Sequence, residues 1–466
     1  MATEHQPTAP RTEPTNASDR LFFFGFLASL GGIAFLGGMI VSIAQMPPYR
    51  TVRDAWIGFS AVVAQQDLLA GEWPAYLWTP TQRTERGLVS RDTSRSTQGY
   101  TVYTTSHDGS AILVDDVGNE VHRWDAAFRK IWPHARHVPS WVPDHFIHMR
   151  KAHVYANGDL LAVYSTTANT PSGCGLAKVD RHGNTIWTFD ENAHHDFDLA
   201  PDGTIFALTH HVRQLAGNDE LASLSTVPLI EDEVTILDSK GSEVKTISIL
   251  DALVDSPYFR PILCHVDRFG DILHVNTIDV IDEQFAAHYD AISPGDVMIC
   301  LRNLELMVVM NPDSGQIVWA TTGPWNHPHD PDPLPNGNIL IFDNYHVRGT
   351  EHGSAVLEFN PRSREIVWQY AGTADAPLRS DIRSRQQLLA GGNVLITDSD
   401  NGRLLEVTRD GEIVWEYLNP IRGGERDDLI PVVCGGHRYT AAELPFLADE
   451  PNSPGDATLA QTRHQN

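Results

Sequence analysis

Basic residues and cysteines are scarce in this sequence. Its 466 residues include 34 Lys and Arg against 60 Asp and Glu, a formal net charge of −26. A surface this acidic repels phosphate backbones, so we expect no nucleic-acid partner. Only four cysteines occur, without a CxxC pair that would indicate zinc or thiol redox chemistry. Their spacing leaves open two disulfides, one or none: they are Cys174, Cys264, Cys300 and Cys434.

Charge is absent altogether from one segment near the N-terminus. Leu21 to Met46 is 26 residues without Asp, Glu, Lys or Arg. At about 1.5 Å per residue, a helix of this length exceeds a hydrocarbon core of roughly 30 Å. The sequence therefore predicts a transmembrane anchor over 21–46, after a disordered tail over 1–20. A single-pass anchor in the cell membrane would place the remainder on the extracytoplasmic, or periplasmic, side if the tail stays inside.

The alternative for this segment is a cleaved signal peptide. Ser42-Ile43-Ala44 has small residues in the arrangement of a cleavage site, before a break at Pro47-Pro48. A signal peptide normally has an apolar region of only about 7–15 residues, which favours the anchor. The following stalk, over 47–98, contains apolar residues at helical spacing between Val52 and Val63, which predicts one short helix.

One phrase, an apolar strand, a turn with Gly, Asp or Ser, and a second strand that often carries Trp, recurs six times. Each copy predicts a β-hairpin. The copies are Val114–Trp124, Val179–Phe189, Leu237–Ile247, Met310–Thr321, Phe359–Tyr370 and Val407–Tyr417.

A second phrase with a turn glycine precedes most of these copies, for example Pro201-Asp202-Gly203 and Pro335-Asn336-Gly337. Two hairpins per unit make four strands, which is one blade of a β-propeller. The sequence therefore predicts an all-β, six-bladed propeller over 99–420, with a C-terminal extension over 421–466. A β-sandwich array or another number of blades is the alternative, but sandwiches rarely repeat one Gly-turn-Trp phrase six times.

Histidines stand at matching places in two of these units. His195 and His329 each lie eight residues before the turn glycine, and each is followed by Asp. This position begins the innermost strand of a blade, which lines the central channel. The fourth unit supplies His274 and Asn276 in an equivalent place, if an insertion of about thirteen residues precedes Gly295. The next strand of that unit carries Arg302.

Such a set suits sulfuryl or phosphoryl transfer. Negative charge spreads over peripheral oxygens in these reactions, so catalysis depends on positioning and on cationic donors. A neutral imidazole is a competent nucleophile, a second imidazole can move a proton near neutral pH, and a guanidinium matches two anionic oxygens. Asp196 and Asp330 are expected to orient their neighbours. His194, His210, His211 and His327 are expected in supporting or surface positions.

Two simpler interpretations remain for these residues. A His-Asp pair at the start of a strand is often only a capped turn, although its repetition in register favours function. The many His and Asp residues leave a metal site open, but no tight ligand spacing such as HExxH occurs. We expect no metal and no cofactor.

The run from His274 to Val280, with Arg302-Asn303, resembles the arylsulfotransferase family. So do His329-Asp330-Pro331-Asp332, the opening Gly99–Tyr103 and the closing Arg438-Tyr439. The resemblance covers roughly residues 86–440. It implies an exported six-bladed propeller that moves sulfate from a phenolic sulfate ester to another phenol without a nucleotide donor, and no Gly-rich phosphate loop occurs here. Its small-molecule partners would be phenols and aryl sulfates.

The resemblance also implies residue roles. His329 matches the histidine that becomes transiently sulfated, and His195, His274, Asn276 and Arg302 match supporting residues. Three features depart from the better-known soluble members: an anchor and short stalk replace a cleaved leader and an extra N-terminal β domain, a closely spaced cysteine pair near the site is missing, and insertions stand near Ser256–Phe259 and before Gly295. The phenol and the oligomeric state are left open.

The resulting hypothesis is a two-step transfer through a sulfohistidine. His329 attacks the donor sulfur while Arg302, His195 and Asn276 hold the sulfonate oxygens. His274 moves the phenolic proton, and its role and that of His195 are interchangeable at this point. The alternatives are a non-catalytic binding propeller of the cell envelope and a metal-dependent hydrolase or lyase on the same scaffold.

Overall fold

The computed structural model describes residues 17–43, 74, 76–166, 172–214, 228–259, 270–347, 352–373 and 376–449. The chain separates into two units, residues 1–72 and 73–466, which are described here one by one. The short helix expected between Val52 and Val63, together with Cys264, lies outside the described residues. The other three cysteines, Cys174, Cys300 and Cys434, are buried free thiols.

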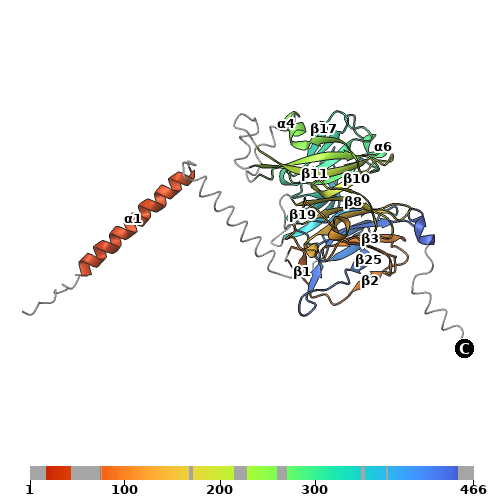
Figure 1. Ribbon diagram of the computed structural model, residues 1–466, viewed down its shortest axis with the longest axis horizontal. Helices are drawn as coiled ribbons and strands as arrows, with labels where there is room; N and C mark the ends of the chain where they lie inside the picture. Colours follow the sequence, from red (N-terminus) through yellow and green to blue (C-terminus); the bar gives the residue numbers. More distant parts are fainter. Residues whose placement is uncertain are drawn as a thin grey trace, which may run out of the picture. The chain divides into compact units, whose positions relative to one another are not determined.

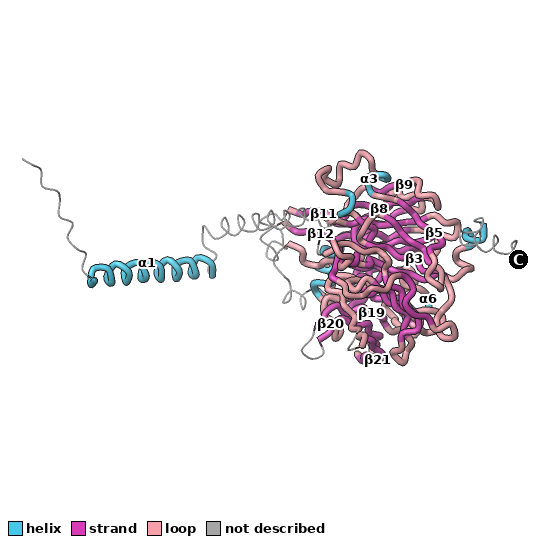
Figure 2. The backbone as a smooth tube through the Cα atoms, turned by 90° about the horizontal axis from the view of Figure 1, so that it is seen from below, coloured by secondary structure: helices cyan, strands magenta, loops and turns pink. Residues whose placement is uncertain are grey.

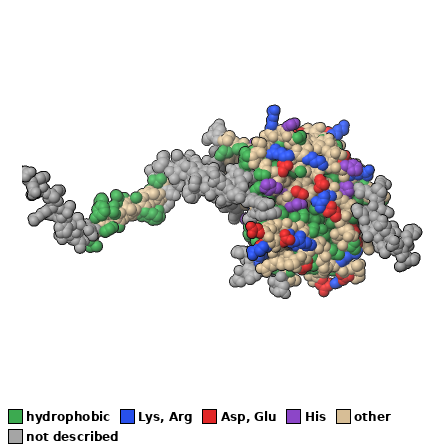
Figure 3. Space-filling model, turned by 60° about the horizontal axis from the view of Figure 1, so that its bottom comes forward, with side chains coloured by type: hydrophobic (Ala, Val, Ile, Leu, Met, Phe, Trp, Pro, Cys, Tyr) green, Lys and Arg blue, Asp and Glu red, His purple; other side chains and the backbone are tan. Residues whose placement is uncertain are grey.

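The first unit contains helix α1 (Ala17–Ile43). Within it, residues 21–41 have a mean hydropathy of 2.0 and none of their side chains is buried, which Figure 3 shows as a helix lined with hydrophobic side chains. By length and composition α1 can cross a membrane. A signal sequence has the same properties, so α1 fits both interpretations of this segment.

The second unit is a six-bladed β-propeller, as predicted (Figures 1 and 2). Each blade is an antiparallel sheet whose strands follow one another from the channel outward. From the innermost strand outward, the first blade consists of β27 (Val433–Tyr439), β3 (Tyr100–Thr105), β4 (Ser110–Val114) and β5 (Glu120–Asp125), and the second of β6 (His148–Val154), β7 (Leu160–Ser165), β8 (Gly173–Val179) and β9 (Thr185–Phe189). The third blade consists of β10 (Ala193–Leu199), β11 (Ile205–Arg213), β12 (Leu229–Leu237) and β13 (Glu243–Ser248), and the fourth of β14 (Val275–Val280), β15 (Val297–Leu301), β16 (Leu306–Asn311) and β17 (Gln316–Thr322). The fifth blade consists of β18 (His329–Pro333), β19 (Ile339–Val347), β20 (His352–Asn360) and β21 (Glu365–Tyr370), and the sixth of β22 (Arg385–Leu388), β23 (Val394–Asp398), β24 (Arg403–Val407) and β25 (Ile413–Leu418), with β2 (Gly87–Arg91) outside β25.

The six repeated Gly-turn phrases are the outer hairpins of the six blades, which confirms the blade count. The middle strands are apolar without alternation; β7 and β15, for instance, are buried along their whole length. Both of their faces are covered because each blade packs between two others. The core is accordingly divided into six hydrophobic clusters, one in each interface between neighbouring blades.

Tryptophans of the repeated phrase connect several of the blades to the next one. The indole Nε1 of Trp124 donates to the Gly158 carbonyl of the following blade at 2.9 Å, and Trp368 reaches the Arg409 carbonyl at 2.8 Å. Gly241 has φ +79° and lies against the ring of Trp187, where a Cβ atom would collide with the indole. The turn therefore requires glycine for its conformation and for this close approach.

The ring is closed by pairing strands from the two ends of the propeller sequence. β27 pairs with β3, and β2 pairs with β25, so the sheets extend on both sides of the expected range 99–420. The segment expected as a C-terminal extension thus supplies an innermost strand. A small sheet of β1 (Trp78–Pro80) and β26 (Leu429–Pro431) lies beside this closure.

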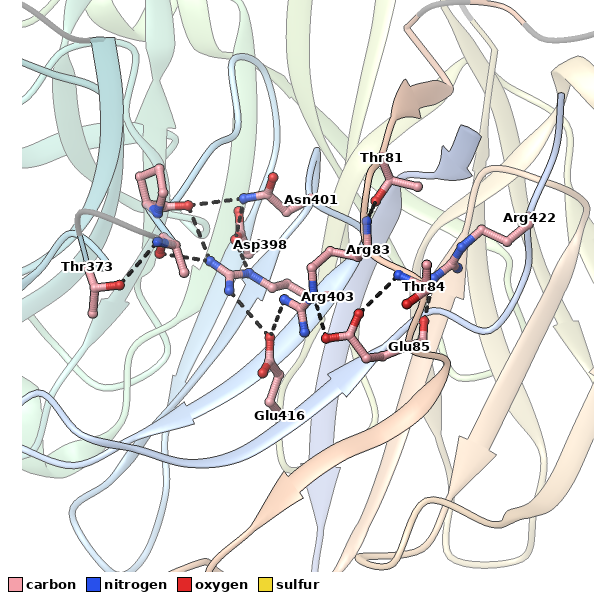
Figure 4. Close-up of polar contacts among 12 residues, drawn as sticks. Thr81, Arg83, Thr84, Glu85, Thr373, Asp398, Asn401, Arg403, Glu416 and Arg422 are labelled. Carbon is pink, nitrogen blue, oxygen red and sulfur yellow. Dashed lines mark hydrogen bonds and ion pairs between the residues drawn. The ribbon is translucent and has the colours of Figure 1, made fainter. Parts of the chain in front are cut away.

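Charged side chains hold the N-terminal segment of the second unit on the last blade (Figure 4). Arg83 forms an ion pair with Glu416 at 3.1 Å, and Glu416 also lies 3.4 Å from Arg403. Arg403 is buried and pairs with Asp398 at 2.6 Å. Short helices fill the connections: α3 (Phe128–Ile131), η1 (Asp144–Phe146), α4 (Ile249–Val254), α6 (Glu283–Ala286), η4 (Arg302–Leu304) and η5 (Pro445–Asp449).

Candidate active site

The innermost strands β6, β10, β14, β18, β22 and β27 contact one another around the channel. Five of these strands share a reference point, which is the residue that pairs with the first residue of the next strand. In β10, for example, this residue is Leu199, which pairs with Ile205 of β11. Three levels follow along the axis. The first level consists of Arg150, His195, Asn276, His329 and Ser384. The second level consists of Lys151, Asp196, Thr277, Asp330 and Arg385. The third level consists of His153, Asp198, Asp279, Asp332 and Gln387.

Irregular pairing brings the first two levels to the same side of their strands. Successive side chains of a regular strand point to opposite faces, but a β-bulge interrupts this alternation. The pairing shifts between Ala193 and Phe197 in β10, between His329 and Asp332 in β18, and at the corresponding places in β6 and β14. As a result, neighbours such as His195 and Asp196 both face the channel.

A cavity of about 300 Å³ lies at the first level, and we call it the histidine cavity. It contains three of the four predicted catalytic residues, since His195, His274 and Arg302 line it, with the rings of His195 and His274 5.2 Å apart. His329 is buried beside it, within electrostatic reach of Arg302 and His274. The full lining is His148, Arg150, Ser165, Ser172, His194, His195, His210, Ile230, Asp232, Asp271, His274, Val275, Arg302, Ile382 and Arg383.

The backbone around this cavity is strained. His195 and His274 have φ values of +50° and +48°, and His327 and Asp330 have values of +50° and +53°. Residues other than glycine rarely adopt this left-handed conformation, and such strain gathers at functional sites. This conformation turns the imidazole rings of His195, in β10, and of His274, just before β14, toward the histidine cavity.

The position of His274 differs from the predicted alignment. His195, Asn276 and His329 lie three residues before Asp198, Asp279 and Asp332, respectively. In the fourth blade, Asn276 therefore occupies the level at which the third and fifth blades carry a histidine. His274 lies two residues earlier, directly before β14, and reaches the cavity through its left-handed backbone. Arg302, expected on a strand, lies in η4 just after β15.

The protonation of the His329 ring follows from its neighbour Asn344. The Asn344 Nδ2 atom donates to the carbonyls of Ser380 and Arg383 at 2.6 and 2.7 Å, so its Oδ1 atom is the acceptor that lies 2.7 Å from His329 Nδ1. Nδ1 therefore carries the proton and Nε2 the lone pair. Nε2 is buried and has no hydrogen-bond partner among the residues that the structure describes. Burial, followed by Arg150 and Arg302, lowers the pKa of His329 well below its ordinary value, which keeps the ring neutral.

Three guanidinium groups line the histidine cavity. Arg302, Arg150 and Arg383 form no ion pair with a carboxylate of the described residues. Burial, and then the neighbouring Arg383, lowers the pKa of Arg150 to about 9. The Nε atoms of Arg302 and Arg383 are buried without an acceptor, as are both ring nitrogens of His148. A buried charge without a partner is costly, so this cavity is prepared for an anion.

His274 is paired with a carboxylate. Its Nδ1 atom lies 2.6 Å from Asp271 Oδ2, and the His274 side chain is 27% exposed. Burial opposes ionisation of Asp271, but the hydrogen bond with His274 and the nearby imidazoles hold the pKa of Asp271 below its ordinary value. A neutral His274 therefore donates Nδ1–H to Asp271 and has Nε2 free, and the carboxylate stabilises the ring when it is protonated.

The three predicted substrate-binding residues lie outside the wall of the histidine cavity. The Asn276 Nδ2 atom donates to the Pro328 carbonyl at 2.8 Å, and this contact holds the segment that precedes His329. Asp196 accepts from Lys151 at 2.6 Å and lies 3.2 Å from Arg385, while Asp330 lies 2.7 Å from the same guanidinium. These ion pairs form a layer across the channel at the second level.

A larger cavity of about 610 Å³ begins beyond this layer, and we call it the acidic cavity. Its carboxyl groups include Asp198, Asp279 and Asp332, which occupy the same level on three successive innermost strands. Burial raises the pKa of Asp198, and it raises the pKa of Asp279 and Asp332 well above the ordinary value. Because the innermost strands run in one direction along the axis, the two cavities lie at opposite ends of the channel.

One group of residues has ligand atoms close enough for a metal ion among the described residues: His194, His210 and Asp232, whose atoms lie within 4.8 Å of one another. The two rings stack with centroids 4.1 Å apart and an angle of 20°. A metal bound in the plane of one ring would lie out of the plane of the other. The arrangement present is that of a stacked histidine pair beside a carboxyl group, and a metal would require one ring to turn.

Sequence reasoning missed Arg150, Arg383, His148 and Asn344. The signal for Arg150 was available, since it lies eight residues before Gly158, as His195 and His329 lie before their turn glycines. The count was applied to histidines only, although a guanidinium at the same level serves an anion equally well. Asn344 lies within the middle strand β19, where no repeated phrase marks it, and only the contact with His329 reveals it.

Comparison with solved structures finds matches at low sequence identity. They include a protein of unknown function from Bacteroides caccae, at 13% identity and TM-score 0.43 over 72% of this chain and 99% of that one. Virginiamycin B lyase from Staphylococcus aureus is 11% identical, with TM-score 0.37 over 76% and 97%. At these scores the likeness adds nothing beyond the fold that the six sheets define.

No curated protein matches the sequence. The arylsulfotransferase (ASST) family matches residues 137–420, which is more than half of the 466 residues and includes His195, His274, Arg302 and His329. The matched segment runs from before the second blade to the end of the sixth. The chain therefore belongs to the arylsulfotransferase family.

Proposed function

We propose that this protein transfers a sulfuryl group from a phenolic sulfate ester to a phenol through a sulfohistidine at His329. The observation that carries the proposal is the histidine cavity, in which Arg150, Arg302 and Arg383 have no carboxylate partner among the described residues. The buried Nε2 atom of His329 lies beside this cavity, also without a partner in the described part of the chain. Family membership supports a sulfotransferase in general, and the cavity supports this particular route.

In the first half-reaction the Nε2 lone pair of His329 attacks the sulfur of the aryl sulfate, forming an N–S bond as the S–O bond to the aryl group breaks. Arg302 and Arg150 hold the sulfonate oxygens, whose negative charge is spread in the transition state. Asn276 positions the His329 segment through Pro328, and Asp196 and Asp330 anchor the adjoining layer of ion pairs.

His274 moves the phenolic proton. Its protonated ring, stabilised by Asp271 at 2.6 Å, gives a proton to the departing phenolate oxygen. The neutral ring then takes the proton of the acceptor phenol, whose oxygen attacks the sulfur and releases His329. His195 lines the cavity beside His274 and serves as a donor to the sulfonate.

We also propose that α1 is a retained anchor and that the propeller works on the extracytoplasmic side of the membrane. Its apolar span, Leu21–Val41, has 21 residues and exceeds the apolar region of a typical signal peptide, which has about 7–15 residues. N-terminal sequencing of the protein from purified membranes tests this: a mature N-terminus after Ala44 contradicts it, and proteolysis of the propeller in intact cells with a permeable outer layer supports it.

The covalent step is tested by mass spectrometry. The full-length protein is mixed with 4-nitrophenyl sulfate, quenched in a basic denaturant that preserves N–S bonds, and weighed. We expect an adduct of about 80 daltons, the mass of one SO3, on the peptide that contains His329.

His329→Ala should abolish both the adduct and 4-nitrophenol release. The matched control is His288→Ala, which removes a half-buried imidazole of the connection between β14 and β15. This ring contacts the Pro335 carbonyl, and the variant should label normally. An adduct that persists in His329→Ala, or maps to another histidine, contradicts the assigned nucleophile.

A further inference from the structure

The histidine cavity has a second side, which the proposed transfer leaves largely unused. His148 and Arg150 belong to β6 in the second blade, and Arg383 lies just before β22 in the sixth. These two blades flank the first blade, which lies opposite the fourth in a ring of six. Apart from Arg150, the groups assigned to the reacting sulfur come from the third, fourth and fifth blades; they are His195, His274, Arg302 and His329. Two guanidinium groups and an imidazole therefore complete the cavity on the side of the first blade.

Arg150 and Arg383 converge near the innermost strand of the first blade. Burial raises the pKa of Cys434 in β27, and both guanidinium groups lie close enough to oppose this. Burial, followed by the same two groups, lowers the pKa of His148 well below its ordinary value, so its ring is neutral. Arg150 Nη2 also donates at 3.3 Å to the carbonyl of Ile382, the residue before Arg383. His148, Arg150 and Arg383 thus form one cluster.

Two side chains of this cluster are buried and have polar atoms without a partner. His148 and Arg383 are each 2% exposed. Arg383 Nη1 donates to the Tyr76 carbonyl at 2.8 Å, whereas its Nε atom has no acceptor in the described part of the chain. Both ring nitrogens of His148 also lack a hydrogen bond there, since the Phe146 carbonyl lies outside hydrogen-bond geometry. Asp400 lies within electrostatic reach of Arg383 but accepts a backbone amide at 2.9 Å and forms no ion pair with the guanidinium. Buried donors normally have an acceptor, and this cluster lacks one.

The proposed transfer supplies one anion for three guanidinium groups. An aryl sulfate carries a single negative charge, and the transfer places that charge between two of the three. The carboxyl groups in the cavity wall are Asp271, which His274 contacts at 2.6 Å, and Asp232, whose pKa burial raises to about 7. Neither forms an ion pair with an arginine of the described residues. Arg383 is left with a buried charge that nothing in the transfer compensates, which is costly unless a second anion binds.

We propose that Arg383 and His148 bind this second anion, a carboxylate on the phenol that accepts or releases the sulfuryl group. The inference rests on the proposed function and names its substrate class, phenols with a short carboxylate-bearing arm. The planar fork of a guanidinium matches the two oxygens of a carboxylate, and the neutral imidazole of His148 donates one N–H beside it. Arg150, which acts on both His148 and His329, stands between the carboxylate and the sulfonate.

The remaining wall suits the ring of such a phenol. The apolar residues that line the cavity are Ile230, Val275 and Ile382, and Ile382 is 38% exposed directly before Arg383. A cavity of about 300 Å³ is at the lower end of the range for small-molecule sites, which favours a single ring. The leaving and the attacking oxygen exchange places at the same sulfur, so both phenols use the same carboxylate subsite.

The test compares acceptors that differ in charge alone. The full-length protein receives 4-nitrophenyl sulfate as donor and 4-hydroxyphenylacetate or 3-(4-hydroxyphenyl)propanoate as acceptor, each beside its primary amide. The amide has the same shape and nearly the same phenolic acidity but carries no charge. For at least one of the pairs, we expect kcat/KM to be about tenfold or more higher with the carboxylate than with the amide, the size of one hydrogen bond between charged groups.

Variants separate the carboxylate subsite from the groups that hold the sulfonate. In Arg383→Gln the carboxylate-to-amide ratio of kcat/KM should fall to about one. His148→Phe keeps the shape of the ring without its N–H, and the ratio should fall about threefold or more. Arg302→Met should lower turnover of both acceptors and keep the ratio. Arg426→Gln removes an equal charge from an 85% exposed side chain and is the matched control, with the wild-type ratio. Thermal melts first show which variants are folded.

Calorimetry with the four acceptors, without donor, measures the same preference in the absence of turnover. A carboxylate that binds the wild type no more tightly than its amide, or an equal loss of the preference in Arg302→Met and Arg383→Gln, overturns the carboxylate subsite and leaves the sulfuryl transfer in place. A preference that is present in binding and lost in Arg383→Gln, without transfer to any phenol, overturns the proposed function instead.

Discussion

The histidine cavity and the acidic cavity are built from the same innermost strands and carry opposite charge. At one end, Arg150, Arg302 and Arg383 line the cavity and have no carboxylate partner in the part of the chain that the structure describes. At the other, Asp198, Asp279 and Asp332 gather at one level, three residues along β10, β14 and β18 from His195, Asn276 and His329. The residues of the second level, Lys151, Asp196, Asp330 and Arg385, pair with one another and separate the two ends.

This difference shows how a propeller channel is polarised. Because its innermost strands run in parallel along the axis, a shift of three residues in every strand moves a side chain from one end to the other. An aryl sulfate is attracted to the cationic end and repelled by the acidic end. The four predictions that follow separate the two ends, beginning with the largest effect.

The first prediction concerns the guanidinium groups. Arg302→Met and Arg150→Met should each lower kcat/KM for an aryl sulfate by about 10²- to 10³-fold, since each removes a donor to the charge of the transition state. The measurement is initial-rate kinetics with 4-nitrophenyl sulfate and phenol. Asp279→Asn is the control at the acidic end and should change the rate by less than about threefold. If Asp279→Asn lowered kcat/KM as much as the arginine variants do, the two cavities would act as one site.

The second prediction concerns the orientation of His329. Asn344→Leu removes the acceptor of His329 Nδ1–H, so the ring no longer presents Nε2 in one tautomer. We expect kcat to fall by about 10- to 100-fold with KM little changed, as for other residues that orient a reactive group. Asn344 also holds two backbone carbonyls, so a thermal melt must first show that the variant is folded. A change confined to KM would contradict the orienting role.

The third prediction concerns stability at the acidic end. Burial raises the pKa of Asp279 in the folded protein above its value in the unfolded chain. The folded state then binds more protons, so stability is greatest below the unfolded pKa of about 3.9 and falls as the pH rises toward the folded pKa. Asp279→Asn should weaken this fall and raise the Tm at pH 7, by about 1–2 °C for each kcal/mol relieved in a domain of this size. An unchanged Tm–pH profile would show that the carboxyl is neutralised in another way.

The smallest expected effect is that of metal removal. A cavity that relies on guanidinium groups needs no ion to hold a sulfonate, and the stacked rings of His194 and His210 do not converge on one. Dialysis against EDTA should therefore change turnover by less than about twofold. A loss restored by added zinc would support the metal-dependent alternative and require the two rings to separate.

The repeated phrases were sufficient to predict the blade count. Each blade must bury both faces against its neighbours, and each therefore repeats the same turn, with a tryptophan in five of the six copies. They did not predict how the ring closes. The pairing of β27 with β3 joins residues more than 300 positions apart, and no local pattern records such a contact. The range 99–420 ended where the repeats end, whereas the propeller continues to Tyr439.

For the site, the sequence by itself determined that histidines recur at one register, since the count back from a turn glycine is preserved along a strand. Only the tertiary structure decided which side chains meet. Bulges turn successive residues to one face, Asn344 selects the tautomer of His329, and Arg150 joins from a blade that carries no matching histidine. These outcomes depend on distances between blades, which follow from packing around the ring and are not encoded in any single segment.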